Sequence, residues 1–274
     1  MNTTTKTASA LVESAMMVAL ATVLSIFKII EMPYGGSVTI ASMLPMIILA
    51  YRQGVAWGLG SGLVYAAIQQ LLGLNDLSYV TGWQSVVAVI MLDYIVAFTV
   101  VGLGGLFRKV TKTQSGALAL GSLSVTLLRY ICHVISGATV WAGLSIPDSA
   151  ALIYSIGYNA TYMLPEAIIL VAVAYYLGGV IDFSKSTPVR FANTSHTRGN
   201  ISIYLFSGLS FLLGAVIDVW LIAPHLQNEE TGEFYFKGLV NVEWVAVAIV
   251  SVLTVAIGLA LIIYEKRRSA NTQK

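Results

Sequence analysis

Long apolar runs separated by short polar stretches dominate this chain. They predict eight helical segments, at residues 8–30, 38–50, 55–73, 84–107, 117–143, 151–177, 201–223 and 239–264. Most of the runs reach the roughly 20 residues that a helix needs to cross a hydrocarbon core of about 30 Å. They are continuously apolar instead of alternating over about ten residues, which favours helices over barrel strands. The second run is short for a crossing, which leaves open an earlier start or a partly re-entrant segment.

The composition agrees with a membrane location. Hydrophobic residues make up 57% of the chain and charged residues 10%, with a mean hydropathy of +0.81, against roughly 25% charged residues in ordinary soluble domains. The first run is too long for the core of a signal peptide and has no strongly basic segment in front of it, so we expect it to be retained. The sequence therefore predicts an all-α, multi-pass integral membrane protein.

Basic residues are distributed unevenly among the loops. Cytoplasmic loops of membrane proteins carry an excess of Lys and Arg, and here one alternating set of loops holds nearly all of them, whereas the other holds essentially Lys237. Both termini are therefore expected in the cytoplasm, and the acidic loop at Glu229, Glu230 and Glu233 outside. The basic set comprises Lys6, Arg52, Arg108, Lys109, Lys112, Lys185, Arg190, Arg198, Lys266, Arg267, Arg268 and Lys274.

The polar stretch 183–200 predicts a cytoplasmic linker between two parts of the chain. It divides a six-span unit, residues 1–182, from a two-span C-terminal extension, residues 201–274. Small residues recur every four positions at Gly54, Gly58 and Gly62 and at Ala15 and Ala19. Such spacing places them on one helix face, where backbones can approach closely. Packing within the chain is the ordinary explanation for this spacing, and we expect it for the glycines.

Ionisable side chains inside a membrane are costly and are candidates for function. Counting about 1.5 Å per residue from the outer ends of their spans, Asp93, His133 and the amide of Asn159 share a level about 12 to 15 Å deep. Arg129 and Glu166 come out deeper, about 21 to 22 Å from the outside. The deeper two predict a structural ion pair. Asp93 has no obvious protein cation, so it either takes up a proton, as in a proton relay, or awaits a cationic ligand.

Aromatic residues gather near the level of Asp93 and above it. Belts of Trp and Tyr at the bilayer interface account for some of them, Trp83 among these. Trp141 lies just over two turns from His133 on adjoining parts of one helical face. A carboxylate, an imidazole, an amide and aromatic rings at one depth favour a pocket for a flat, polar, cationic heteroaromatic molecule. The aromatic residues are Tyr34, Tyr79, Trp83, Tyr94, Trp141, Tyr154, Tyr158 and Tyr162.

Motifs for catalysis are missing from the sequence. It contains no P-loop, no HExxH and no GxSxG elbow, so neither ATP hydrolysis nor hydrolase chemistry is expected of the chain. We also expect no metal site, no cofactor and no nucleic-acid partner. Any energy for transport must come from a partner or an ion gradient.

Several segments in order resemble the thiamine-specific S-components (ThiT/YuaJ type) of the energy-coupling factor (ECF) vitamin transporters. The resemblance covers about residues 8 to 182. It rests on Pro33-Tyr34-Gly35-Gly36-Ser37-Val38-Thr39, Met43-Leu44-Pro45, Leu92-Asp93-Tyr94-Ile95-Val96-Ala97-Phe98, Arg129-Tyr130 with His133, Gly137 and Trp141, and Tyr154-Ser155 with Tyr158-Asn159.

This resemblance implies a six-helix fold with an outward-facing thiamine pocket, closed by the loop between the first two helices. It implies ligand contacts from Asp93, His133, Trp141, Tyr154 and Asn159. We add Tyr94, Tyr34, Trp83 and Tyr158 as further candidates. The family can carry glutamate where this chain has Asp93, so the shorter side chain changes the detailed hydrogen bonding.

The same resemblance implies partners in a bacterial plasma membrane. Ala15 and Ala19 would face an ECF transmembrane coupling subunit, and two cytoplasmic ATPases would supply the work of release. Two alternatives remain open: the same fold with another vitamin or a thiamine precursor, or a stand-alone secondary transporter in which Asp93 and His133 titrate. The resemblance assigns no role to the C-terminal extension.

Overall fold

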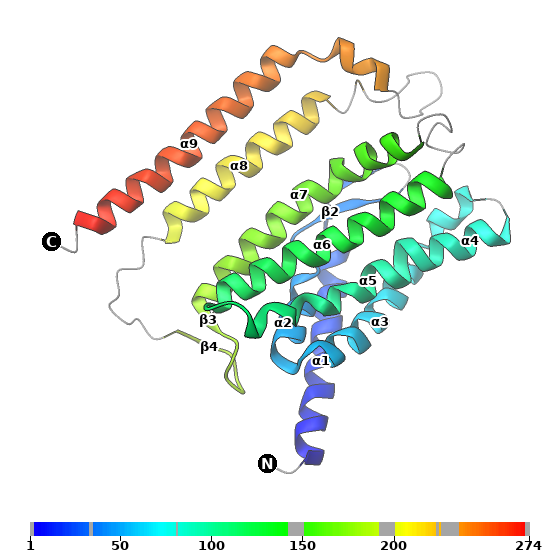
Figure 1. The fold of residues 1–274 in the computed structure, drawn as a ribbon, viewed down its shortest axis with the longest axis vertical. Coiled ribbons are helices and arrows are strands. Elements are labelled where there is room, and N and C mark those ends of the chain that lie inside the picture. The colour runs from blue at the N-terminus through cyan, green and yellow to red at the C-terminus, as the bar shows by residue number, and fades with distance from the viewer. Residues whose placement is uncertain are drawn as a thin grey trace. The chain divides into compact units, whose positions relative to one another are not determined.

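The computed structural model describes residues 3–32, 35–80, 82–141, 151–191, 201–222, 225 and 236–271. The chain forms two compact units, Met1–Arg190 and Phe191–Lys274. Figure 1 shows that both are built almost wholly of helices. The prediction of an all-α fold is therefore confirmed.

The first unit contains six helices within the described residues. In it, α6 and α7 lie side by side along their lengths (Figure 1). Most boundaries fall within a few residues of the apolar runs, because polar or glycine residues end each run. The six are α1 (Thr3–Ile26), α2 (Leu44–Gln53), α3 (Val55–Leu72), a continuous helix over Trp83–Lys109, α6 (Gln114–Thr139) and α7 (Ala151–Val180).

The predicted second crossing at 38–50 is wrong. After α1 the chain forms an antiparallel hairpin, β1 (Lys28–Glu31) with β2 (Ser37–Thr39), and only then α2. At ten residues α2 is about 15 Å long, half of what a crossing needs. All eight residues from Leu44 to Tyr51 are buried, so their apolar character serves packing inside the protein, not contact with lipid.

The helix over Trp83–Lys109 changes its winding along its length. It begins as α4 (Trp83–Val89), widens to a π-helical segment, η2 (Ile90–Val96), and continues through α5 (Ala97–Thr99) into the 3₁₀ segment η3 (Val100–Lys109). Short π-helical stretches inside α-helices occur often at functional sites. Here the π segment carries Asp93 and Tyr94.

Small residues let α3 approach this helix closely. A Cβ on Gly58 would collide with the carbonyl oxygen of Gly102, and one on Gly62 would lie 2.8 Å from that of Thr99. A Cβ on Gly54, in contrast, would meet no atom of another part of the chain within 4 Å. Gly58 and Gly62 therefore pack within the chain, as predicted.

At the end of α7 the chain folds into a second hairpin, β3 (Ile181–Asp182) with β4 (Val189–Arg190). The Arg52 guanidinium, which is paired with Glu13 of α1, donates to the carbonyl oxygens of Phe183, Lys185 and Ser186. Part of the stretch predicted as a linker is thus folded onto the first unit, which ends at Arg190.

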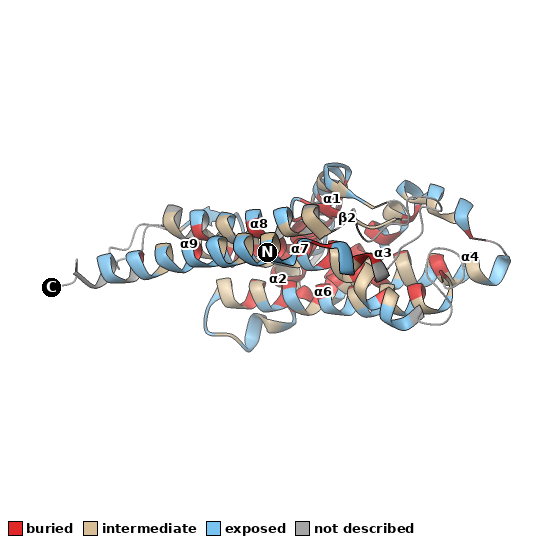
Figure 2. Cartoon of the chain, turned by 90° about the horizontal axis from the view of Figure 1, so that it is seen from above, coloured by how far each residue is buried: buried red, intermediate tan, exposed pale blue. Residues whose placement is uncertain are grey.

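The second unit is a pair of long helices, α8 (Ile201–Ile222) and α9 (Trp244–Asn271), preceded at α9 by a 3₁₀ turn, η6 (Phe236–Asn241). Hydroxyl groups join the two helices: Ser207 donates to Gly258 O at 2.8 Å and Ser210 to Thr254 O at 2.8 Å. Long stretches of α9 are exposed (Figure 2), and only 6% of its most apolar 18-residue stretch is buried in the protein.

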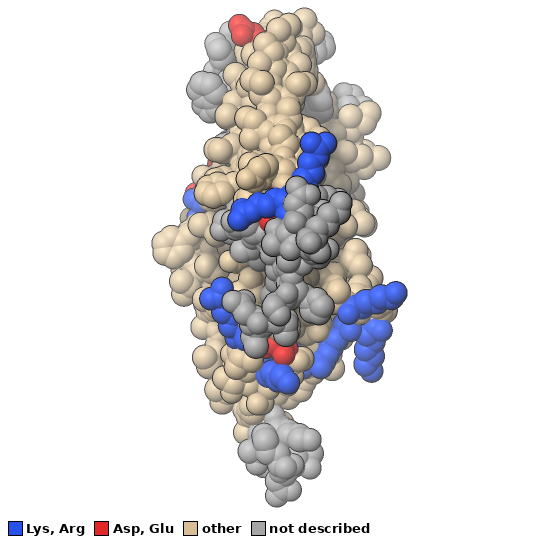
Figure 3. All heavy atoms as spheres, turned by 90° about the vertical axis from the view of Figure 1, so that its left-hand side faces the viewer, with Lys and Arg blue, Asp and Glu red and all other residues tan. Residues whose placement is uncertain are grey.

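Six helices among the described residues are long and apolar enough to cross a membrane. They are α1 from Thr7, α3, the helix Trp83–Lys109, α6, α7 from Leu152 and α9 up to Glu265. On the face shown in Figure 3 most of the described surface is uncharged, and most of the charged side chains visible there are Lys and Arg. These features are those of a multi-pass membrane protein, since charged side chains avoid hydrocarbon.

Candidate ligand-binding site

A cavity of about 920 Å³ lies in the first unit. It is bounded by α1, the β1–β2 hairpin, α3, the helix Trp83–Lys109, α6 and α7. Its volume is within the range typical of small-molecule sites. Its wall combines aromatic rings with charged and hydrogen-bonding groups. The predicted contact residues that line it are Asp93, Tyr94, His133, Trp141, Tyr158 and Asn159.

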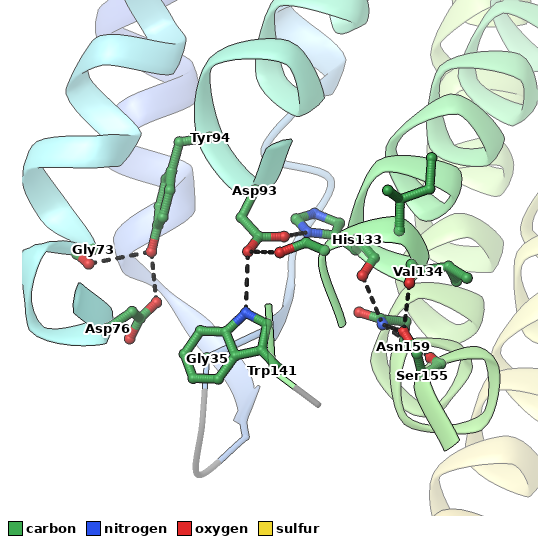
Figure 4. Close-up of polar contacts among 12 residues, drawn as sticks. Gly35, Gly73, Asp76, Asp93, Tyr94, His133, Val134, Trp141, Ser155 and Asn159 are labelled. Atoms are coloured by element: carbon green, nitrogen blue, oxygen red, sulfur yellow. Dashed lines mark hydrogen bonds and ion pairs between the residues drawn. The ribbon is translucent and has the colours of Figure 1, made fainter. Parts of the chain in front are cut away.

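The carboxylate of Asp93 has three hydrogen-bond partners in the protein. One oxygen lies 2.8 Å from Nδ1 of His133, and the other accepts from Ser136 Oγ at 2.6 Å and Trp141 Nε1 at 3.3 Å (Figure 4). A carboxylate offers about four lone-pair positions. Three are used by the protein, so roughly one remains for a ligand.

The sequence indicates no obvious protein cation for Asp93, and the structure shows that its carboxylate nevertheless has three hydrogen-bond partners. Residues predicted at one depth in separate spans meet in space, because α6 turns the faces of His133 and Ser136 toward the π segment. An ionised carboxylate only accepts hydrogen bonds, so Nδ1 of His133 carries the hydrogen toward Asp93. Nε2 of His133 is buried and has no hydrogen-bond partner among the described residues. It is therefore the ring nitrogen of His133 that the described part of the protein leaves without a partner.

Asn159 holds α7 against α6. Its amide nitrogen donates to the carbonyl oxygens of Ser155, at 2.9 Å, and His133, at 3.2 Å, and its oxygen accepts from Tyr162 at 2.5 Å. Ser155 adds a bond from its hydroxyl to Val134 O at 2.8 Å (Figure 4). The amide thus lines the cavity while its hydrogen-bonding groups are largely engaged within the protein.

Below this level, Arg129 and Glu166 lie together. Their side chains approach to 3.4 Å and are 6% and 4% exposed. Glu166 also accepts from Thr39 of β2 at 2.9 Å, and the guanidinium lies 4.4 Å from the ring centre of Phe98. The charges of Arg129 and Glu166 neutralise one another, so this pair adds little net charge to the cavity wall.

The remaining aromatic candidates differ in position. Tyr154 packs against the cluster that contains Trp141 and is not among the cavity-lining residues. Trp83 is 72% exposed at the start of α4, as expected for an interfacial aromatic. Tyr158 donates to Gly35 O at 3.1 Å and so contacts the β1–β2 hairpin. Tyr34 lies outside the described residues.

Several polar residues of the site were not predicted from the sequence, Ser136 and Asp76 among them. Ser136 is fully buried and lies three residues after His133, so helical spacing alone places both on one face. Asp76, in the 3₁₀ turn η1 (Leu74–Tyr79) after α3, lines the cavity and accepts from Tyr94 at 2.5 Å. An acidic residue in a short connection is usually solvated, so the sequence position of Asp76 does not indicate a place in the site.

Other predicted surfaces are placed less specifically. Ala15 and Ala19 are both exposed on α1, alongside exposed apolar neighbours such as Leu11, Met16 and Leu20. Within the part of the chain that the structure describes, no group of three or more His, Cys, Asp or Glu side chains could hold a metal ion. The site is thus a ligand pocket whose wall includes the heavily bonded Asp93 carboxylate and a second carboxylate, that of Asp76.

Comparison with known proteins identifies the source of this arrangement. Residues 11–182 match the family described as thiamine transporter protein (Thia_YuaJ). The chain belongs to this family. The match covers most of the first unit and includes every described residue of the pocket. The family is one of transport proteins, so the prediction that the chain is not an enzyme is confirmed.

Individual relatives agree with the family assignment. The thiamine transporter ThiT of Bacillus subtilis is 36% identical over 174 residues, which cover 60% of this chain and 86% of that protein. ThiT of Lacticaseibacillus paracasei is 27% identical over 154 residues, covering 53% of this chain and 71% of that protein.

A solved structure shares the fold of the family. ThiT from Listeria monocytogenes matches with a TM-score of 0.52 at 21% identity and covers 63% of this chain and 94% of that structure. The resemblance to ThiT-type S-components drawn from the sequence is confirmed by these matches. The extent of the match leaves the C-terminal unit as an addition to the part shared with these relatives.

Proposed function

We propose that this chain captures thiamine from outside the cell in the cavity around Asp93. The observation that carries the proposal is the Asp93 carboxylate, held by His133, Ser136 and Trp141 in a cavity of about 920 Å³. Membership of a family of thiamine transporters supports it. Thiamine combines a permanently cationic thiazolium ring with an aminopyrimidine that has donors and acceptors, and both features have counterparts in the wall.

Asp93 attracts the cation and keeps its orientation through three bonds to the protein. His133 presents Nε2, whose lack of a protein partner costs about 1 to 3 kcal/mol until a ligand donor reaches it. Trp141 offers a ring face that favours a cationic heteroaromatic ring, while its indole nitrogen remains fixed on Asp93. Asn159 and Tyr158 shape the α7 side, and Tyr154 supports Trp141 from behind.

The deeper Arg129–Glu166 pair is proposed to be structural. It links α6 and α7, and through Thr39 it also holds β2. A buried pair that is fully compensated stabilises an arrangement only while both partners are present. Its neutral sum leaves recognition of the cation to Asp93.

We further propose that the chain passes thiamine to an ATP-driven ECF module. The exposed small-residue face at Ala15 and Ala19 on α1 would dock the transmembrane coupling subunit, with both termini of the chain in the bacterial cytoplasm. Two cytoplasmic ATPases would then supply the work of emptying the pocket. Residues 1–182 would suffice for capture, with 183–200 as the connection to the extension.

Tryptophan fluorescence of the purified full chain in detergent tests capture. Thiamine should quench the signal saturably, and Trp141→Ala should abolish the quenching while Trp83→Ala retains it. Quenching by a different vitamin, with none by thiamine, would keep the fold and contradict the substrate.

Uptake into lipid vesicles tests the coupling. Thiamine accumulation should require ATP together with the coupling subunit and the ATPases. Accumulation by the chain alone, driven by a proton gradient, would instead identify a secondary transporter.

A further inference from the structure

The tip of the β1–β2 hairpin is held between two other parts of the first unit. Gly35 and Gly36, which directly precede β2, have φ angles of +87° and +91°. Residues with a side chain rarely adopt such angles. A Cβ on Gly35 would lie 2.9 Å from Asp76 Oδ2, and one on Gly36 would lie 2.7 Å from the ring of Tyr162. The backbone of the hairpin thus touches a carboxylate on one side and an α7 tyrosine on the other.

Tyr94 binds the same carboxylate oxygen of Asp76 that lies nearest to Gly35. The Tyr94 hydroxyl donates to Asp76 Oδ2 at 2.5 Å and lies 3.2 Å from Gly73 O (Figure 4). Since a phenol has one hydrogen, the shorter contact to a carboxylate is the stronger of the two. Gly73 accommodates the phenol because a Cβ there would collide with it. Tyr94 is 8% exposed and Asp76 is partly exposed, so this bond is partly buried at the cavity wall.

Tyr94 and Asp93 are neighbours on the π segment but face different walls. Asp93 points to α6, where it meets His133 and Ser136, whereas Tyr94 points to the end of α3. The hydrogen bonds of the two side chains show that they reach different elements. Any shift of the π segment that follows ligand contact at Asp93 therefore also moves Tyr94 and its bond to Asp76.

We propose that Asp76 is a positioning residue that fixes the hairpin to the ligand-contacting wall. Its carboxylate accepts from Tyr94 and lies against Gly35, so one side chain joins the segment that carries Asp93 to the backbone of β1–β2. This inference rests on the proposed capture of thiamine and adds a residue outside the predicted contact set. The joint slows the escape of a bound cation, because the hairpin borders the same cavity.

Dissociation of radiolabelled thiamine from the full chain, chased with excess unlabelled thiamine, measures this effect. Asp76→Asn keeps the shape of the side chain but replaces a charge-assisted bond with a neutral one, which is expected to speed dissociation by about five- to tenfold. Tyr94→Phe removes the donor and is expected to do the same. If both act through one bond, the double variant is no faster than either single variant.

A matched glycine pair separates contact from backbone strain. Gly35→Ala and Gly82→Ala both place a side chain at positive φ, +87° and +86°, but Gly82 has nothing within 4 Å. We expect Gly35→Ala to speed dissociation and Gly82→Ala to leave it near the wild-type rate. The effect of Gly35→Ala should shrink in an Asp76→Gly background, where the facing carboxylate is gone.

The outcomes distinguish the two proposals. A wild-type chain that retains thiamine, with an unchanged dissociation rate in Asp76→Asn or additive effects in the double variant, overturns the role of Asp76 and leaves capture standing. A wild-type chain that binds no thiamine overturns the proposed function, and the role of Asp76 with it. A melting temperature of Asp76→Asn close to that of the wild type shows that a faster rate does not reflect unfolding.

Discussion

Replacing Asp93 with asparagine removes the charge at the centre of the site while nearly preserving its shape. Ser136 and Trp141 both donate to the same oxygen of Asp93, so the amide oxygen of the variant should stay there and its NH2 group should face His133. Nδ1 of His133 must then accept, which moves the hydrogen of the neutral ring to Nε2. The variant thus loses a charge and also turns the unpartnered ring nitrogen from an acceptor into a donor.

The size of the loss follows from the geometry. Because three protein bonds occupy the carboxylate, a ring cation approaches to about 5 Å, where two unit charges attract by about 3 kcal/mol at an effective dielectric constant of about 20. Water recovers part of this for the free ligand. We therefore expect Asp93→Asn to weaken thiamine binding at least tenfold, about 1.4 kcal/mol.

Equilibrium titration of detergent-purified protein measures this change. Asp218→Asn is a suitable control, since Asp218 of α8 is also an aspartate in an apolar helix and accepts from Ser251 Oγ at 2.6 Å. Its affinity for thiamine should equal that of the wild type. An Asp93→Asn variant that binds thiamine within twofold of the wild type refutes the assignment of Asp93 as the cation partner.

Three further predictions concern packing and organisation. Glu166→Ala leaves the Arg129 charge buried and should lower the free energy of unfolding by about 3 kcal/mol or more, seen as a lower melting temperature. The double variant Arg129→Met, Glu166→Leu should recover most of this stability. Equal melting temperatures of the single and double variants would contradict this. Gly58→Ala should destabilise the chain because its Cβ meets Gly102, while Gly60→Ala, with open space around it, should be neutral or slightly stabilising in the same thermal assay. A chain ending at Arg190 should bind thiamine with wild-type affinity in a titration, since every cavity-lining residue lies before that point; weakened binding would give the extension a part in the site.

The fold class and the depth of the site in the membrane could be predicted from the sequence, because they depend on the length of apolar runs, their hydropathy and the residue count within each run. Run length and hydropathy locate helices in a membrane. The residue count from the end of a span gives depth, and by this measure Asp93 and His133 share one level.

Features that depend on helix rotation and local winding could not be predicted in the same way. The apolar pattern of 38–50 is the same for a crossing and for a buried core helix, and only the structure distinguishes them. The π segment redirects Asp93 and Tyr94 to different walls, which regular helical spacing does not reveal. Asp76 reaches the cavity through the course of η1, a property of the backbone that no residue pattern encodes.

Isothermal titration calorimetry of thiamine into the purified full chain, without any partner, tests the central claim most directly. The account predicts one binding site per chain with submicromolar affinity and a heat signal that is lost or strongly reduced in Asp93→Asn. Absence of binding by a folded wild-type chain, or binding unaffected by the loss of Asp93, would contradict it.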